Sequence, residues 1–287
     1  MPTAAALRLE IEHALERKFP AALTPAPRAM YEVAATGIAV IDELLRGGLP
    51  VGAISELTGA TSSGRTSLAL QFVAQRTAEE RACAWVDVSD AFDPESAAAN
   101  GVELRRLLWV RCKDREQKDI ERGGGIGGVR SHPKVRLDAA NFRMGHPMSW
   151  KSSAWARLER GLRATDLLLQ AGGFAAIVLD LGDTAPEQAT RIPLATWFRY
   201  RQAAERTQCS LVVVGARGYA KSAAAVVLEC SARNVKQRGG TVLRGFEFQV
   251  RRERERSAPI EITTRKPPAA TWQANAAWDA DRNARTR

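Results

Sequence analysis

A glycine-rich stretch, Gly59–Ser67, contains the residue types and the spacing that could bind phosphate. It reads Gly-Ala-Thr-Ser-Ser-Gly-Arg-Thr-Ser and follows the pattern Gly-x-x-x-x-Gly-Lys-[Ser/Thr], except that Arg65 replaces the lysine. In such a phosphate-binding loop (P-loop), glycines let backbone N–H groups surround the phosphates, and a hydroxyl at the position of Thr66 reaches a magnesium ion. The predicted nucleotide-binding residues are Gly59, Ala60, Thr61, Ser62, Ser63, Gly64, Arg65, Thr66 and Ser67.

The residues on both sides of this stretch predict the elements that a P-loop needs. An apolar run, Ala53–Leu57, follows Pro50 and Gly52 and predicts a strand. A helix-compatible run begins at Ser67. Strand, glycine-rich loop and helix therefore follow one another, so the positive N-terminal end of the helix would face the same anion as the loop.

Further short apolar runs predict the rest of a sheet, with helical patterns between them. Buried strands are expected at 83–87, 107–111, 175–181 and 210–215, and later strands at 223–230, 245–250 and 259–263. Helices are expected over 40–45, 155–169 and 194–206. This alternation predicts the α/β fold class, with a doubly wound, mainly parallel sheet that is flanked by helices.

Changes in composition divide the chain into three regions. Residues 1–33 predict a short amphipathic helix and a proline-rich connector, and residues 34–265 predict the core. At about 113–152 the core is interrupted by a basic, glycine-rich stretch without sustained periodicity, which predicts a flexible insertion. Residues 266–287 are poor in aliphatic side chains and predict a poorly ordered tail.

Two tryptophans, Trp272 and Trp278, lie in this predicted tail. Large aromatic side chains are costly to leave in water, so each of them either docks back on the core or contacts another protein. We therefore treat both as candidates for partner binding.

The balance of charges favours a polyanionic partner. The 287-residue chain has a formal net charge of +10 and a pI near 9.9. Nucleic acid is the leading candidate, and a generally basic surface without a docking face is the alternative. Basic residues outnumber acids through the middle of the insertion, which fits either contact with single-stranded DNA or a solvated surface insertion. The candidate DNA-binding residues are Arg122, Arg130, Lys134, Arg136 and Arg143.

The four cysteines lie far apart, without a Cys-x-x-Cys pair. This spacing predicts reduced, buried thiols in a cytoplasmic protein and does not favour a zinc site. No run of about 18 apolar residues is present, so we expect neither a membrane span nor a membrane partner.

Several motifs resemble the RecA recombinase core in their order and spacing. They are the segments 36–37, 47–50, 59–67, 85–94 and 161–172 and the residue Asp180. The resemblance extends from about residue 34 to about residue 264 and weakens after residue 183. It implies a RecA-like P-loop fold in which Thr66 and Asp180 hold magnesium beside ATP.

Three departures from the RecA pattern affect one mechanism. Arg65 stands where the family has its phosphate-binding lysine, and Ser89 stands where it has the glutamate that activates the attacking water. The family's Asn-Gln sensor pair is replaced by Gly215-Ala216. Asp90 is a candidate substitute for the missing base, and no catalytic residue is assigned beyond these candidates. We therefore expect ATP with Mg²⁺ to bind weakly or not at all, with negligible turnover.

A retained scaffold with lost chemistry resembles ImuA, the RecA-related accessory protein family of bacterial mutagenesis cassettes. This resemblance implies an adaptor for ImuB and an error-prone C-family polymerase in translesion synthesis, with RecA and single-stranded DNA as further partners. A second function stays open, namely an ATP-dependent, single-stranded-DNA-binding recombinase-type ATPase with an atypical loop. The retained Gly59, Gly64, Thr66, Asp87 and Asp180 favour the ATPase, whereas the three departures favour the adaptor.

Overall fold

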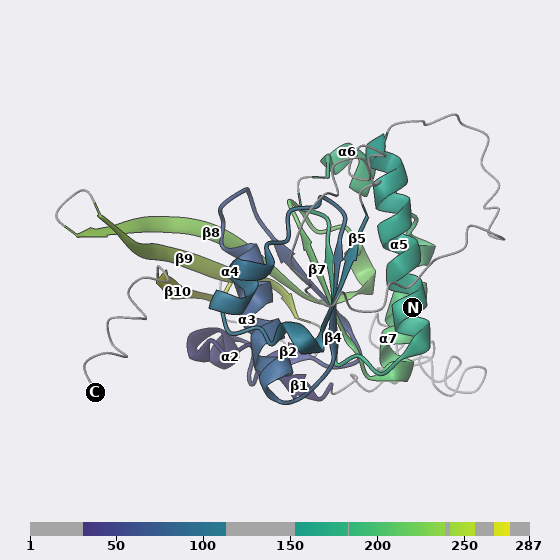
Figure 1. Ribbon diagram of the computed structural model, residues 1–287, viewed down its shortest axis with the longest axis horizontal. Helices are drawn as coiled ribbons and strands as arrows, with labels where there is room; N and C mark the ends of the chain where they lie inside the picture. Colours follow the sequence, from purple (N-terminus) through teal and green to yellow (C-terminus); the bar gives the residue numbers. More distant parts are fainter. Residues whose placement is uncertain (1–30, 113–152, 183, 239–241, 256–266, 276–287) are drawn as a thin grey trace, which may run out of the picture.

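The computed structural model of this protein describes residues 31–112, 153–182, 184–238, 242–255 and 267–275. Its main sheet consists of β3 (Ile54–Thr58), β4 (Cys83–Asp87), β5 (Leu107–Arg111), β6 (Ala176–Asp180), β7 (Ser210–Gly215), β8 (Ala224–Arg238), β9 (Val242–Glu255) and β10 (Ala269–Asn275). The strand order is β10-β9-β8-β3-β7-β6-β4-β5 (Figure 1). Neighbours from β8 to β5 are parallel, and β9 is antiparallel to both β8 and β10.

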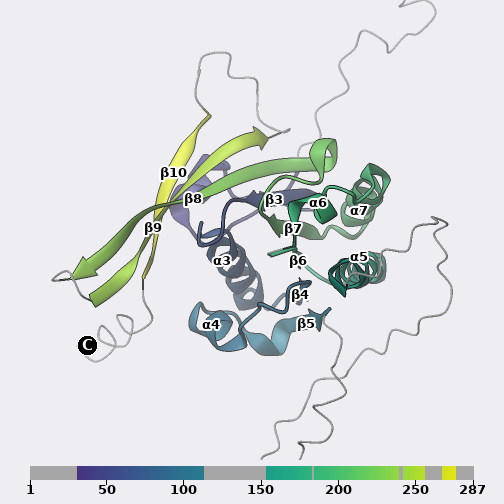
Figure 2. The same cartoon turned by 90° about the horizontal axis from the view of Figure 1, so that it is seen from above.

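Helices cover both faces of the parallel part of the sheet. The elements outside the sheet are α2 (Ala39–Leu44), α3 (Arg65–Ala78), α4 (Pro94–Ala99), α5 (Ser153–Ala171), α6 (Pro186–Ala189), α7 (Leu194–Thr207), the 3₁₀ turns η1 (Leu104–Arg106) and η3 (Lys221–Ala223), and a small antiparallel pair, β1 (Val33–Ala34) with β2 (Leu49–Pro50). Viewed from above, α3 and α4 lie on one face, and α5 and α7 lie on the other (Figure 2). The predicted fold class, a mainly parallel α/β sheet between helices, is confirmed.

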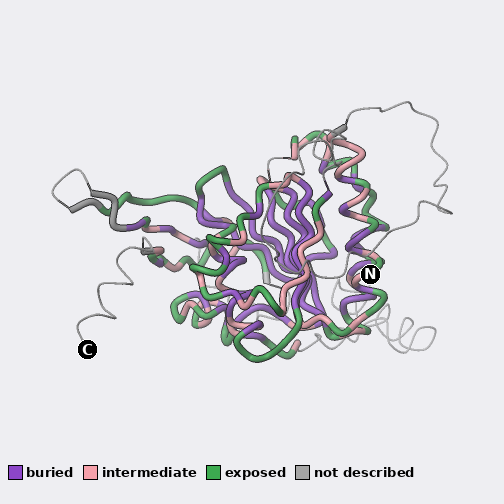
Figure 3. Tube along the Cα trace, in the orientation of Figure 1, coloured by how far each residue is buried: buried purple, intermediate pink, exposed green. Residues whose placement is uncertain are grey.

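Each face of the sheet packs into its own apolar cluster. On one face, Leu68 and Phe72 of α3 pack with alternate strand residues such as Trp85. On the other, Leu158 and Trp197 of α5 and α7 pack with the intervening residues. Every residue of β4, β6 and β7 is buried (Figure 3), which explains their nearly unbroken apolar sequences.

The strands β8 and β9 form a long ribbon that extends beyond the body of the fold (Figure 1). Only Ala224–Glu229 of β8 pairs with β3, whereas the pairing of β8 with β9 continues to Arg238. Both strands are therefore longer than the predicted 223–230 and 245–250. The inner part of this ribbon contributes Cys230, Phe248 and Val250 to the same cluster as α3.

Strand β10 corrects the prediction of a poorly ordered tail for residues 269–275. These residues pair with β9 from Ala269 opposite Arg251 to Asn275 opposite Gly245. Trp272 is the only large apolar side chain in the segment, and its inward-facing neighbours are alanines, so alternation gave a weak signal. The predicted N-terminal helix, most of the proline-rich connector that follows it up to residue 33, the insertion at 113–152 and the strand at 259–263 lie outside the described residues.

Among the residues that the structure describes, no helix combines the length and apolar character needed to cross a membrane. All four cysteines are buried and free. Their burial raises the pKa of each thiol to about 12, as expected for structural thiols.

Candidate nucleotide-binding site

The P-loop leaves the carboxyl end of β3 and leads directly into α3. Its backbone turns through the left-handed region, with φ of 152° at Gly59, 61° at Ser62 and 87° at Gly64. Glycine tolerates these angles best, which explains the first and last of the three. Gly64 is the N-cap of α3, and the exposed Thr66 lies in the first helical turn. The predicted strand, loop and helix are therefore present, although the helix begins at Arg65 rather than Ser67.

The Arg65 side chain is bound to the protein's own backbone. It is 7% exposed, its Nη1 donates to the carbonyl oxygen of Gly59, and its Nη2 donates to the carbonyl oxygen of Gly182 at 3.2 Å. These carbonyls belong to the loops that follow β3 and β6, so Arg65 joins the two loops. A phosphate in the P-loop would have to compete with both carbonyl groups for the guanidinium.

Asp180 lies at the end of β6 and is 4% exposed. Its Oδ1 accepts a hydrogen bond from the N–H of Gly182 at 2.8 Å. Burial, followed by the charge of Asp87 on β4, raises the pKa of Asp180 to about 6. Because a nearby cation would favour the ionised carboxylate, this position is chemically suited to assist in holding Mg²⁺.

Asp87 organises the turn that follows β4. Its Oδ1 accepts from the N–H of Ala91 at 3.1 Å, and its Oδ2 accepts from the N–H of Phe92 at 3.0 Å. The Oδ2 also accepts from the indole of Trp109 at 3.3 Å. This fully buried carboxylate is therefore satisfied by the turn and by β5.

The two candidates for catalysis in this turn have structural partners. The Ser89 hydroxyl donates to the carbonyl oxygen of Leu181 at 3.3 Å. Asp90, which has a φ of 60°, forms a two-point ion pair with Arg111 on β5, with Nε–Oδ1 and Nη2–Oδ2 distances of 2.7 and 2.9 Å. Both carboxylate oxygens of Asp90 thus contact a guanidinium, which makes Asp90 a poorer general base.

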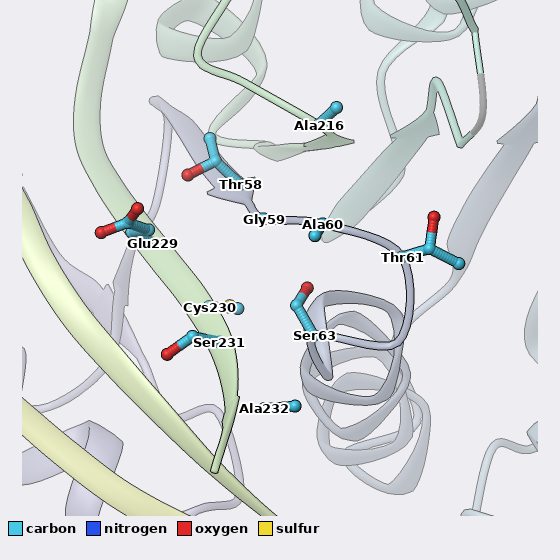
Figure 4. A pocket seen from close by; sticks show the side chains of 10 residues that line it. All are labelled: Thr58, Gly59, Ala60, Thr61, Ser63, Ala216, Glu229, Cys230, Ser231 and Ala232. Atoms are coloured by element: carbon cyan, nitrogen blue, oxygen red, sulfur yellow. The ribbon is translucent and has the colours of Figure 1, made fainter.

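A cavity of about 330 Å³ adjoins the P-loop on the side of β8 (Figure 4). Its walls are Thr58, Gly59, Ala60, Thr61, Ser63, Ala216, Glu229, Cys230, Ser231 and Ala232. Ser63 is 3% exposed, and its buried hydroxyl has no hydrogen-bond partner within the described part of the chain. Because Arg65 and Thr66 do not line this cavity, it lies beside the loop rather than at the start of α3.

Glu56, a buried carboxylate of β3, holds the loop that follows β7. Its Oε1 accepts from the N–H groups of Tyr219 and Ala220 at 2.5 and 2.8 Å. Burial raises the pKa of Glu56, while these two hydrogen bonds act in the opposite direction. The strand that leads into the P-loop is thereby connected to the segment that begins at Ala216, where the RecA pattern has its sensor glutamine.

The backbone conformation of the site suits a magnesium nucleotide, whereas its side chains suit one less well. The positive φ angles of Gly59 and Gly64, the N-terminus of α3 and the exposed Thr66 suit phosphates and a cation. Within the described ranges, no three His, Cys, Asp or Glu side chains gather in one place. The predicted ligands Thr66 and Asp180 would hold Mg²⁺ together with phosphate oxygens.

Comparison with known proteins supports the relation already suggested by the P-loop. Residues 5–122 match the RecA N-terminal domain family. The RecA proteins of Crocosphaera subtropica and a Nostoc species are each 41% identical over 86 residues, which is 30% of this chain and 25% or 24% of those proteins. The chain thus aligns with about a quarter of the length of these relatives.

Among solved structures, the RadB recombinase is similar with a TM-score of 0.49 and 16% identity. That match covers 83% of this chain and 94% of the RadB chain.

The structure brings only part of the predicted site together. Gly59–Ser67, Ser89 and Asp180 lie at one edge of the sheet, and Asp90 lies nearby in its ion pair. Trp272 is only 6% exposed, because it packs against the core, and in this arrangement it is not presented to a partner. The DNA-binding candidates Arg122, Arg130, Lys134, Arg136 and Arg143, and the partner candidate Trp278, lie outside the described residues.

Three contacts of the loop were not predicted from the sequence, namely those of Gly182, Cys230 and Phe248. Gly182 accepts the Arg65 hydrogen bond. A Cβ atom added to Gly59 would collide with the Cys230 carbonyl, and one added to Gly64 would lie 2.7 Å from the Phe248 ring. The alternation of Phe246, Phe248 and Val250 predicts a strand, but it does not indicate which loop that strand contacts.

Proposed function

We propose that this protein is a RecA-related accessory protein of DNA repair, of the ImuA type, whose P-loop binds nucleotide weakly and does not turn it over. In this proposal the RecA-like core serves as an adaptor for an ImuB-like protein and an error-prone polymerase. RecA and single-stranded DNA are further proposed partners. The match of residues 5–122 to the RecA N-terminal domain supports the relation to RecA.

The observation that carries the proposal is the engagement of Arg65. Phosphoryl transfer depends on neutralising charge at the phosphates and on positioning the attacking water. The guanidinium of Arg65 contacts carbonyls of Gly59 and Gly182, and the carboxylate of Asp90 contacts Arg111. Neither Arg65, for charge neutralisation, nor Asp90, for water activation, is therefore held ready for its step.

A recombinase-type ATPase remains the second candidate, because one part of the geometry favours it. The P-loop glycines keep the backbone conformation of a phosphate cradle, and Asp180 lies on the strand between β7 and β4. If nucleotide displaced the carbonyls from Arg65, this arginine could supply positive charge to the phosphates.

ATP turnover by the full chain, with and without single-stranded DNA, distinguishes the two functions. The adaptor predicts the same negligible rate for the native chain and for Arg65→Ala under both conditions. The ATPase predicts DNA-stimulated turnover that Arg65→Ala abolishes. Such stimulation would overturn the adaptor proposal and return Ser89 and Asp90 to consideration as catalytic groups.

A further inference from the structure

The ring of Phe248 lies between Trp272 of strand β10 and the P-loop. Trp272 of β10 is the direct register partner of Phe248 on β9, and the two ring centroids are 5.1 Å apart. The Phe248 ring in turn lies on Gly64, where an added Cβ would be 2.7 Å from two ring carbons. Trp272, Phe248 and Gly64 therefore form one continuous contact from the C-terminal strand to the loop.

All members of this contact are shielded from water. Phe248 and Trp272 are 5% and 6% exposed, and both belong to the apolar cluster that contains Leu68 and Phe72 of α3. The Trp272 indole N–H is buried without a hydrogen-bond partner among the described residues. The side chain therefore contributes through packing, and aromatic pairs at this separation add stability beyond area burial.

Strand β8 supports the other end of the loop. A Cβ atom at Gly59 would collide with the carbonyl oxygen of Cys230. Gly59 thus contacts strand β8, and Gly64 contacts the neighbouring strand β9. Either contact would exclude a larger residue at its glycine, independently of any bound phosphate.

We infer that β10 positions the P-loop, with Phe248 and Trp272 as the positioning residues, so that docking of the C-terminal strand and binding of a nucleoside polyphosphate stabilise one another. A loop that is already packed against a strand loses less conformational freedom when phosphate binds. Because thermodynamic linkage is reciprocal, nucleotide binding in turn stabilises the docking of the strand. The link to nucleotide rests on the proposed function, whereas the positioning of the loop does not.

Amide hydrogen exchange on the full chain without nucleotide tests the positioning. Trp272→Ala should speed exchange of the Gly59–Thr66 amides by roughly tenfold, which corresponds to about 1.4 kcal/mol of local stability. Amides of β6 should be unchanged. Gln273→Ala is the matched control, because Gln273 is an exposed neighbour on the same strand, and Trp272→Phe should restore the native pattern by keeping an aromatic contact.

Unchanged loop exchange in Trp272→Ala would overturn the inference. If that variant loosens β6 as much as the loop, Phe248→Leu decides, since it removes the ring from Gly64 and keeps an apolar residue on β9. Faster exchange confined to the loop in Phe248→Leu supports positioning, and loop exchange at the native rate overturns it.

Titration with a fluorescent ATP analogue tests the link to nucleotide separately. Trp272→Ala should weaken binding by roughly tenfold relative to Gln273→Ala. If the native chain binds no nucleotide, the nucleotide site of the proposed function fails, and the hydrogen-exchange result still decides the positioning of the loop. If both variants bind equally well, the link is overturned.

Discussion

Asp87 and Asp180 are register partners on the adjacent parallel strands β4 and β6, so two buried carboxylates lie side by side at one edge of the sheet. Asp87 accepts hydrogen bonds from backbone N–H groups of the following turn and from the Trp109 indole, whereas Asp180 accepts one from the N–H of Gly182. Together with burial, which is the larger cause, this pairing raises the pKa of Asp180. It also provides the most direct test of the site.

The first prediction concerns pH. Burial and the neighbouring Asp87 raise the pKa of Asp180 from 3.8 to about 6, so the folded state holds this proton more tightly than the unfolded state. The free energy of unfolding from this group should therefore fall as pH rises between about 4 and 6, by about 3 kcal/mol at most. Urea denaturation of native chain and Asp180→Asn at several pH values measures the difference, which should be largest above pH 6.

Magnesium should act against this trend, because a cation stabilises the ionised carboxylate. The native chain should gain stability from Mg²⁺ at pH 7 and lose that gain below about pH 6, whereas Asp180→Asn should gain nothing at either pH. An equal magnesium effect in both proteins would show that Asp180 does not contact the cation.

The second prediction concerns Arg65. Replacing it with lysine removes the planar fork that contacts Gly59 and Gly182 and supplies a compact charge that can reach phosphate. Arg65→Lys should bind ATP roughly tenfold more tightly than the native chain, a change of about 1.4 kcal/mol. Isothermal titration calorimetry measures it, and Arg65→Ala should not reproduce the gain. Weaker binding by Arg65→Lys would show that the arginine itself holds the nucleotide.

The third prediction concerns Glu56. Glu56→Ala leaves the buried N–H groups of Tyr219 and Ala220 without their acceptor, at a cost of about 2 to 4 kcal/mol from two unsatisfied donors. Glu56→Gln keeps an acceptor oxygen without the charge and should cost far less. Chemical denaturation gives both values. Equal losses in the two variants would assign the effect to packing instead of to the hydrogen bonds.

The fourth prediction concerns Asp90 and Arg111. The side chain of Arg111 is 57% exposed, so this ion pair should contribute no more than about 1 kcal/mol despite its two-point geometry. A double-mutant cycle with Asp90→Ala and Arg111→Ala measures the coupling. Since we assign Asp90 a structural partner, ATP turnover should be the same in Asp90→Ala as in the native chain, and a loss of turnover would restore it as a base.

The fifth prediction concerns single-stranded DNA. A contact that depends on phosphate charge should weaken steeply as salt increases and show little sequence preference. Fluorescence anisotropy with oligonucleotides of unrelated sequence measures both properties. Replacing Arg130, Lys134 and Arg136 together by glutamine should reduce the salt slope, and an unaltered slope would place the contact elsewhere on the chain.

The parts of the fold that the sequence predicted are those governed by local pattern. The buried strands β4, β6 and β7 are nearly continuous apolar runs, and the P-loop is marked by Gly59 and Gly64. Strand β10 was missed because Trp272 is flanked at alternate positions by Ala270 and Ala274, which give little alternation signal. Its place in the sheet comes from pairing with β9, a tertiary contact that propensity does not contain.

The candidate site divides in the same way. Its residue types were predicted from motif spacing, but the partner of Arg65 lies in the loop after β6, and the partner of Asp90 lies at the end of β5. Gly182 and Arg111 are distant from them in sequence and carry no motif of their own. Contacts between segments that follow or end different strands are set by the register of the sheet, which a single sequence does not specify.

The contact of Phe248 with Gly64 joins residues separated by more than half of the chain. During synthesis the loop emerges well before β9 and β10, so the strands that pack beside it are added only later. Contacts of such long sequence separation slow folding because a large closure entropy precedes them. A newly made chain would therefore carry its P-loop motif long before that motif reaches its final packing.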